Sequence, residues 1–264
     1  MATKTILFIH GLWMHTSSWQ PWMQFFSERG YTTINPAWPG YSDTVEASRA
    51  NPQAVANYGV KAISDHYAKH ISALQEPPIL IGHSFGGLLV QNLLGRNFGA
   101  AAIAINPAPL KGVWQLPFTV LRSALPVLFN PFNLTKAISL SYGQFRYIFA
   151  NELPETEAKE LYNRFTVPSP VRPLFQAATA TFNPSSETAV NTSNDSRGPL
   201  LITGGEKDHI VPPLLSKASL KKYGSPRAIT EYKLFEGRGH SLVSDHGWKE
   251  IAEYSLSWLN KHGF

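Results

Sequence analysis

The sequence contains no cysteine, and this absence excludes disulfide bonds, thiolate metal ligands and a cysteine nucleophile. It also lacks any apolar run approaching the roughly 18 residues that a membrane-spanning helix needs. The short apolar run near the N-terminus leads directly into a predicted strand and does not look like a secretory signal. We therefore expect a cytoplasmic protein without a membrane span.

Several cofactor signatures are absent as well. The sequence has no His-Glu-x-x-His, no Gly-x-Gly-x-x-Gly after a strand and no P-loop lysine. We therefore expect neither a metal nor a nucleotide cofactor. The net charge is +5, but the basic residues are scattered, and the densest group, Lys217, Lys221 and Lys222, is more economically a solvated helix face. Nucleic-acid binding is not expected.

Short apolar runs of strand length alternate with helical segments along the chain. The runs are not polar on alternate residues, which is typical of a parallel sheet covered by helices on both faces. The predicted strands are 5–10, 32–35, 79–82, 101–106, 200–203 and 231–235. The predicted helices are 19–29, 54–74, 85–96, 213–223 and 248–261. An α/β fold with a sheet of about six strands follows.

The alternation stops between residues 110 and 198, where strand signals disappear and prolines and aromatic residues become frequent. The prolines predict short helices, and the stretch 169–175 resembles the start of one of them. An insertion of this length between core strands commonly forms a lid or binding element. We predict a core domain of residues 1–109 and 199–264 and a helical cap of residues 110–198. The alternative is a structural excursion without substrate contact.

A glycine-rich stretch around Ser84 carries the strongest chemical signal. Gly82-His83-Ser84-Phe85-Gly86 follows an apolar strand and precedes a predicted helix. Small residues two before and two after the serine allow a sharp turn that would expose Ser84 Oγ at the end of the strand and the start of the helix. Such a turn favours a nucleophile. The alternative is a glycine-rich turn with an incidental serine at the helix start.

Three other loops follow predicted strands and carry suitable polar groups. His10-Gly11-Leu12-Trp13 follows the first strand, Gly204 to Pro212 includes Asp208, and Glu236 to Ser241 includes His240 between glycine-rich residues. In parallel α/β sheets, ligands bind at the carboxyl ends of the strands. We therefore expect these loops to meet around Ser84.

With these motifs in the order serine, acid, histidine, the chain resembles the α/β-hydrolase superfamily over nearly its whole length, in particular small serine esterases and the non-haem haloperoxidase-like branch. The first predicted strand, 5–10, would be the third strand of the eight-stranded family fold, so the first two strands of that version are expected to be absent. The resemblance therefore implies an α/β-hydrolase fold with a six-stranded, mostly parallel core. It also implies a cap inserted after the sixth strand of the family fold.

The resemblance also assigns roles to residues. Ser84 would be the nucleophile, His240 its general base, and Asp208 the acid that orients and stabilises the histidine. By analogy with the family, the backbone N–H groups of Leu12 and Phe85 would form the oxyanion hole.

Other candidates for the acid and the base are less suitable. Glu206 is an alternative acid, but the spacing to Val211-Pro212 favours Asp208. His209 and His246 lack the glycine-flanked loop of His240. Asn106 follows a strand where some relatives keep an acid, but an amide cannot act as one.

Three further residues are predicted near the substrate. His83 adjoins the nucleophile, yet consecutive residues of such a turn point apart, which favours a packing or hydrogen-bonding role. His10 is expected to orient the turn that holds Leu12. Trp13 follows that turn, and together with His10 and His83 it is assigned to the substrate pocket.

The function predicted from these residues is hydrolysis of a carboxylic ester or lactone of a small hydrophobic substrate through an acyl-enzyme on Ser84. The same motifs also occur in hydroxynitrile lyases, perhydrolases, carbon–carbon bond hydrolases and cofactor-free dioxygenases, so a non-hydrolytic reaction remains an alternative. A ligand-binding receptor on the same scaffold is a third interpretation.

Overall fold

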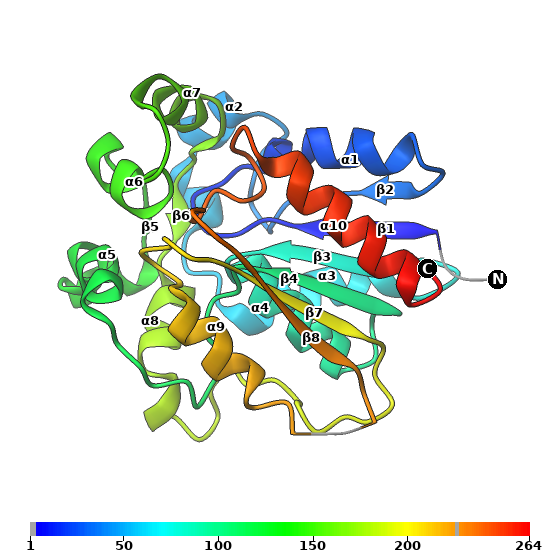
Figure 1. Ribbon diagram of the computed structural model, residues 1–264. Coiled ribbons are helices and arrows are strands. Elements are labelled where there is room, and N and C mark those ends of the chain that lie inside the picture. Colours follow the sequence, from blue (N-terminus) through cyan, green and yellow to red (C-terminus); the bar gives the residue numbers. More distant parts are fainter. Residues whose placement is uncertain (1–3, 225–226) are drawn as a thin grey trace.

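The computed structural model describes residues 4–224 and 227–264. Within them, six strands form one parallel sheet in the order β2-β1-β3-β4-β7-β8 (Figure 1). The strands are β1 (Thr5–Ile9), β2 (Thr32–Ile34), β3 (Ile79–His83), β4 (Ala101–Ile105), β7 (Leu200–Gly205) and β8 (Thr230–Phe235). The six-stranded parallel core expected from the apolar runs is therefore confirmed.

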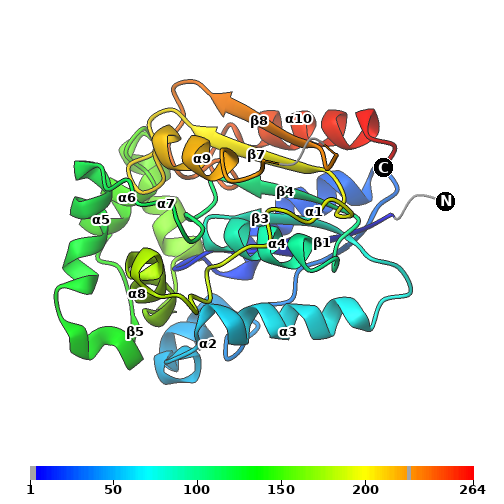
Figure 2. The ribbon, with the colours of Figure 1, turned by 90° about the horizontal axis from the view of Figure 1, so that it is seen from below.

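Each face of the sheet has its own hydrophobic core, because alternate strand residues point to opposite faces. On one face, Leu7 and Ile9 pack with α3 (Val60–Ser72), α4 (Phe85–Gly95) and α9 (Pro213–Leu220). The other face packs against α1 (Gln20–Ser27), which is rich in aromatic residues, and α10 (Trp248–Lys261). Figure 2, seen from below, has α4 in front of the strands and α1 behind them.

The predicted helix 54–74 is wrong in its first part. Residues Pro52–Val55 form a 3₁₀ turn, and α3 begins only at Val60. Asn57 between them has a φ of 64°, a left-handed conformation that ends helical geometry. Helix α2 (Val45–Ala50), capped by the Thr44 side chain, was not predicted.

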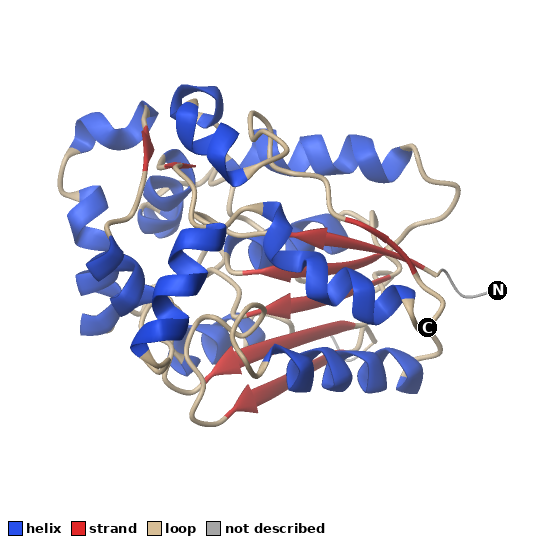
Figure 3. Cartoon of the chain, turned by 90° about the horizontal axis from the view of Figure 1, so that it is seen from above, coloured by secondary structure: helices blue, strands red, loops and turns tan. Residues whose placement is uncertain are grey.

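Between β4 and β7 the chain forms short helices that lie beyond the carboxyl ends of the strands, and Figure 3 shows the arrowheads pointing toward them. They are α5 (Phe118–Leu128), α6 (Tyr142–Ile148), α7 (Glu155–Phe165) and α8 (Arg172–Ala178). Their shortness agrees with the prediction from the prolines. We call residues 110–198 the insertion.

The prediction for 169–175 is partly wrong. Ser169–Pro170 forms β6, which pairs antiparallel with β5 (Ala137–Ile138), and α8 begins only at Arg172. A two-residue ladder carries too little hydrophobic periodicity to be recognised in a sequence.

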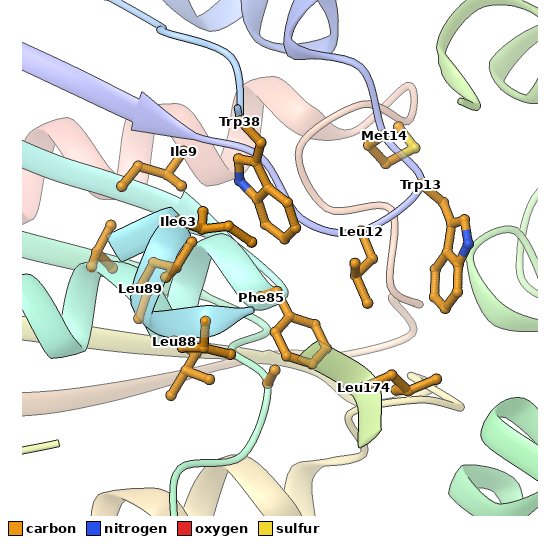
Figure 4. Close-up of a cluster of buried hydrophobic side chains, with 14 of the residues drawn as sticks. Ile9, Leu12, Trp13, Met14, Trp38, Ile63, Phe85, Leu88, Leu89 and Leu174 are labelled. Carbon is orange, nitrogen blue, oxygen red and sulfur yellow. The ribbon is translucent and has the colours of Figure 1, made fainter. Parts of the chain in front are cut away.

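The insertion shares its hydrophobic core with one face of the sheet. Phe145 and Leu174 belong to the same cluster as Leu88 of α4. In Figure 4, Leu174 lies close to Phe85 and to Leu12, which comes from the turn after β1. The insertion is therefore packed onto the elements that carry the predicted site.

None of the helices in the described residues combines the length and the apolar character needed to span a membrane.

The start of α4 approaches β1 so closely that only glycine fits there. A Cβ added at Gly86 would lie 2.1 Å from the carbonyl oxygen of Ile9, and one at Gly82 would lie 2.2 Å from the carbonyl oxygen of Gly86. Both neighbours are backbone atoms, which have little room to move. These two glycines set how closely the turn before α4 approaches the sheet.

The substitution Gly86→Ala should therefore lower the free energy of unfolding by about 3 kcal/mol, because β1 and α4 must separate. Urea denaturation measures this change. Gly143, a helical glycine of α6 with open space around it, is the control, and Gly143→Ala should be neutral or stabilising by about 0.5 kcal/mol. Equal stability of the two variants would contradict the close packing at Gly86.

Candidate active site

Ser84 occupies a strained backbone position between β3 and α4. Its φ of 56° and ψ of −120° are unusual for a residue with a side chain. The position is held by hydrogen bonds from Ser84 N to the carbonyl of Ile105 (2.9 Å) and from Ala108 N to the carbonyl of Ser84 (2.9 Å). This geometry matches the sharp strand-to-helix turn that the two glycines predicted.

His240 and Asp208 come from different loops and are joined by a short hydrogen bond. Nδ1 of His240 lies 2.6 Å from Oδ2 of Asp208, and both side chains are almost completely buried. Because a carboxylate accepts, Nδ1 carries the proton and Nε2 is the basic nitrogen. The other carboxylate oxygen of Asp208 accepts from the backbone N–H groups of Ile210 (2.9 Å) and Val211 (2.8 Å).

Asn106 bridges the loops that carry these two residues. Its Nδ2 donates to Oδ2 of Asp208 (2.8 Å) and to the carbonyl of Gly239 (3.2 Å), and its Oδ1 accepts from Gly205 N (2.9 Å). Asn106 is fully buried and has a φ of 42°. It cannot act as an acid, as expected, but it supplies a donor that the buried carboxylate needs.

His83 also holds the loop that carries His240. Its Nε2 donates to the carbonyl oxygen of His240 (2.8 Å), and the two ring centroids are 4.6 Å apart. Burial, and to a smaller extent the neighbouring His240 ring, lowers the pKa of His83 well below 6.5. His83 is therefore a neutral hydrogen-bond donor, which agrees with the role expected for it.

Two backbone N–H groups near Ser84 are available as donors. The N–H of Phe85 begins α4 and has no partner within the helix, and Leu12 lies in the turn after β1. In the described residues, no hydrogen bond to another backbone or side-chain group occupies either of these amides. Gly11 brings the turn against Ser84, since a Cβ there would lie 2.7 Å from Ser84 Cβ.

Within the described part of the chain, the Oγ of Ser84 forms no hydrogen bond with His240. Bonds of this kind are often long in ligand-free enzymes and tighten when the substrate binds. The structure thus brings the loops of Ser84, His240 and Asp208 to one edge of the sheet, with the histidine–aspartate pair already formed.

His10 fixes the turn that holds Leu12. Nδ1 of His10 lies 2.9 Å from the carbonyl of Gly11, while Nε2 accepts from Trp38 N (3.2 Å), so the proton is on Nδ1. The ring stacks on Trp38, with centroids 5.1 Å apart. Burial lowers the pKa of His10 to about 3, so the ring is neutral.

Trp13 connects the same turn to the insertion. Its N–H donates to Oγ of Ser169 (2.5 Å), its indole N–H donates to the carbonyl of Ile138 (3.0 Å), and its carbonyl accepts from Val167 N (2.9 Å). The side chain is buried and the φ is 63°. The assignment of Trp13 to the substrate pocket stays a prediction, and its anchoring to the insertion was not predicted.

The insertion also contacts the loops of Asp208 and His240. Phe149 packs edge-on against the His240 ring at 5.0 Å, and its carbonyl accepts from Oγ of Ser241 (2.5 Å). Nδ1 of His209 bonds to the carbonyl of Tyr147 (2.9 Å). The insertion thus reaches the turn after β1 and the loops after β7 and β8.

The rival candidates lie in other environments. Glu206 accepts from the backbone N–H of Gly237 (2.9 Å), and His246 is an exposed residue paired with Glu157 of α7 (2.9 Å). Neither forms a hydrogen bond with His240. Among the described residues, no three histidine or acidic side chains are grouped so that they could hold a metal ion.

Comparison with known proteins gives the same fold. The sequence model of the Alpha/beta hydrolase family matches residues 6–254. No curated protein sequence matches the chain at a significant level. Solved structures with the same fold include a monoacylglycerol lipase from Paleococcus ferrophilus, with 19% identity, a TM-score of 0.68 and coverage of 99% of this chain and 96% of that one.

Two plant proteins are also similar. A methylesterase from Arabidopsis has 14% identity and a TM-score of 0.66, and the match covers 97% of this chain and 98% of that one. Methylketone synthase I from tomato, solved with 2-tridecanone, has 13% identity and a TM-score of 0.67, with coverage of 99% and 100%. At such identities, the likeness concerns the fold alone.

The buried, neutral His10 should make the fold sensitive to acid. Its pKa is about 3 in the folded chain and 6.5 when unperturbed, so between these values the unfolded chain binds more protons. Stability due to this group is therefore present above pH 6.5 and lost as the pH falls toward 3. The expected slope is about 1.4 kcal/mol per pH unit.

Urea denaturation at a series of pH values tests this expectation. The variant His10→Gln cannot gain the charge, so its free energy of unfolding should fall less steeply below pH 6.5 than that of the parent chain. Substitution of the exposed His70 by Gln is the control, because it leaves the buried His10 ring in place. Parallel curves for His10→Gln and the parent chain would contradict the assignment.

Proposed function

The chain belongs to the alpha/beta hydrolase family, and from this premise we propose that it is a serine hydrolase that cleaves a carboxylic ester or lactone of a small hydrophobic substrate. The observation that carries the proposal is the buried His240–Asp208 pair, 2.6 Å apart, formed at the edge of the sheet where Ser84 occupies its strained turn. A histidine whose Nδ1 is held by a carboxylate has a basic Nε2 available for a serine hydroxyl.

In the proposed mechanism, Ser84 Oγ attacks the substrate carbonyl and its proton passes to Nε2 of His240. Asp208 stabilises the imidazolium that forms, without taking the proton. The developing oxyanion accepts from the N–H groups of Leu12 and Phe85, and each such donor is typically worth about 3 kcal/mol. The leaving alkoxide then takes the proton from His240, and the acyl group stays on Ser84.

Deacylation reverses these roles. A water molecule gives its proton to Nε2 of His240 and attacks the acyl carbon. The tetrahedral intermediate then collapses, the proton returns to Ser84 Oγ, and the carboxylic acid is released. Asn106 and His83 act as positioning residues, since they hold Asp208 and the backbone of His240.

We further propose that the insertion is a cap over this site. Its support is the set of contacts that it makes with the turn after β1 and the loops after β7 and β8. Ser84 is only 7% exposed and His240 only 1%, so a substrate can reach them only if neighbouring groups move. The ring of Phe149 beside His240 favours an apolar acyl group.

The substitution Ser84→Ala should lower the kcat for an activated ester at least about a thousandfold, because the acyl-enzyme cannot form. Hydrolysis of p-nitrophenyl esters measures this loss, and a fluorophosphonate probe should label the parent chain but not the variant. Ser255→Ala, which alters a buried serine of α10, is the control and should retain full activity.

Unchanged ester turnover in Ser84→Ala would overturn the proposed nucleophile. Oxygen uptake with an aromatic hydroxy-heterocycle that persists in this variant would instead assign the reaction to His240 and Asp208 as a base pair. Absence of both activities, with no labelling of the parent chain, would favour the ligand-binding interpretation.

The cap proposal makes a separate prediction about substrate size. Phe149→Ala should lower kcat/KM for long-chain acyl esters about tenfold or more relative to acetyl esters, because the apolar ring beside the histidine is removed. Phe182→Ala, on the exposed outer part of the insertion, is the control. An equal effect of Phe149→Ala on short and long esters would contradict a cap that selects the acyl chain.

A further inference from the structure

Helix α5 of the insertion presents an apolar face to solvent. Phe118, Leu121, Leu125 and Phe129 recur at helical spacing, and we call these four residues the apolar stripe. Phe118 is 74% exposed and Phe129 is 86% exposed. The opposite side of the helix is already packed, since Ser123 and Val127 are buried. A surface helix normally turns a polar face outward, so the stripe requires an explanation.

The segments on both sides of α5 extend this surface. Trp114 and Leu116 precede the helix, and Phe132 follows it, with exposed fractions of 70%, 64% and 79%. Figures 1 and 2 both place α5 at the outer edge of the insertion, away from the sheet. Large side chains that are this exposed contribute little to the packing of the chain on itself.

The chain segment that carries the stripe has charges of one sign only. No aspartate or glutamate occurs between Glu76 and Glu152, whereas Lys111, Arg122 and Lys136 lie within or beside the exposed segments. Lys222 adds a fourth cation, because its Nζ lies next to Gly112. An apolar surface that has cations and no acidic residue in its own chain segment is complementary to a layer that is negatively charged outside and hydrocarbon inside.

Tryptophan and phenylalanine suit such a layer in particular, since aromatic rings and leucine side chains bury in the boundary between headgroups and acyl chains. Lysine and arginine next to them can reach lipid phosphates. The core of a protein–protein interface is usually poor in charged residues, whereas the stripe has cations in its own segment and lies on one helix at the outer edge of the insertion (Figure 1).

We propose that the apolar stripe, with Trp114, Leu116 and Phe132, docks the protein on the surface of an anionic lipid bilayer. The aromatic and leucine side chains enter the interface and the four cations face the headgroups. The docking surface does not depend on the proposed hydrolase activity. If that activity holds, docking brings the proposed cap and the site of Ser84 to a source of hydrophobic esters.

Sedimentation with lipid vesicles tests the proposal. The full chain and its Ser84→Ala variant, which removes any lipid hydrolysis, are mixed with phosphatidylcholine vesicles that contain or lack phosphatidylglycerol. Both should bind the vesicles with phosphatidylglycerol, more weakly at high salt, and bind those without it at least several-fold less. Because Ser84→Ala is included, binding is measured separately from activity.

Two sets of variants identify the surface. Replacing Phe118, Leu121 and Phe129 together by Ser should weaken binding about tenfold or more, and these exposed positions leave the core intact. Replacing Lys136 and Lys222 by Gln should weaken it several-fold. The controls are Ile229→Ser, an exposed apolar residue just before β8, and Lys4→Gln with Lys69→Gln, which should bind as the parent does.

Three outcomes would overturn the proposal. The first is no binding to either vesicle, and the second is equal binding by the parent chain and the triple serine variant. The third is a dimer in analytical ultracentrifugation without lipid that dissociates in the triple variant, since the stripe would then be a subunit interface. Circular dichroism of the variants confirms that any loss does not come from unfolding.

Discussion

The buried carboxylate of Asp208 ties together the loops after three strands of the sheet. It accepts from His240 in the loop after β8, from Asn106 at the end of β4, and from two backbone amides of its own loop. A buried charge is tolerated only when such donors surround it. The candidate site can therefore form only if β4, β7 and β8 are correctly placed relative to one another. The parallel register, which pairs Ile105 with Thr203 and Gly205 with Phe235, sets these positions.

The core of the fold was predictable because parallel strands that are buried on both faces are nearly continuous apolar runs. The inner strands β1, β3, β4 and β7 are of this kind. The edge strands β2 and β8 are mostly half-buried, yet they were predicted too, and the glycines around Ser84 marked the turn into α4. The insertion was less predictable. Its pair β5 and β6 is two residues long, and the break before α3 depends on the backbone conformation of Asn57, which residue type alone does not specify.

The candidate site, like the fold, was predictable only in part. The motifs located Ser84, Asp208 and His240 in adjacent loops, but not the contacts that hold them. Asn106 lies 102 residues from Asp208 in sequence, and Ser169 lies 156 residues from Trp13. Each of these bonds joins polar groups that are common in any loop, so no local sequence pattern predicts them. The sequence did indicate that Asn106 lies at the end of a strand. Its amide was judged only as a group that cannot act as an acid, so its role as a hydrogen-bond donor to Asp208 was not predicted.

The neighbouring strands β4 and β7 are separated along the chain by the whole insertion, and this affects how the chain is made. During synthesis, the first four strands leave the ribosome well before β7 exists, so β4 remains an open edge of apolar residues with unpaired backbone groups. Such edges recruit other strands. The nascent chain therefore passes through an aggregation-prone interval, which ends only when β7 is translated and closes that side of the sheet.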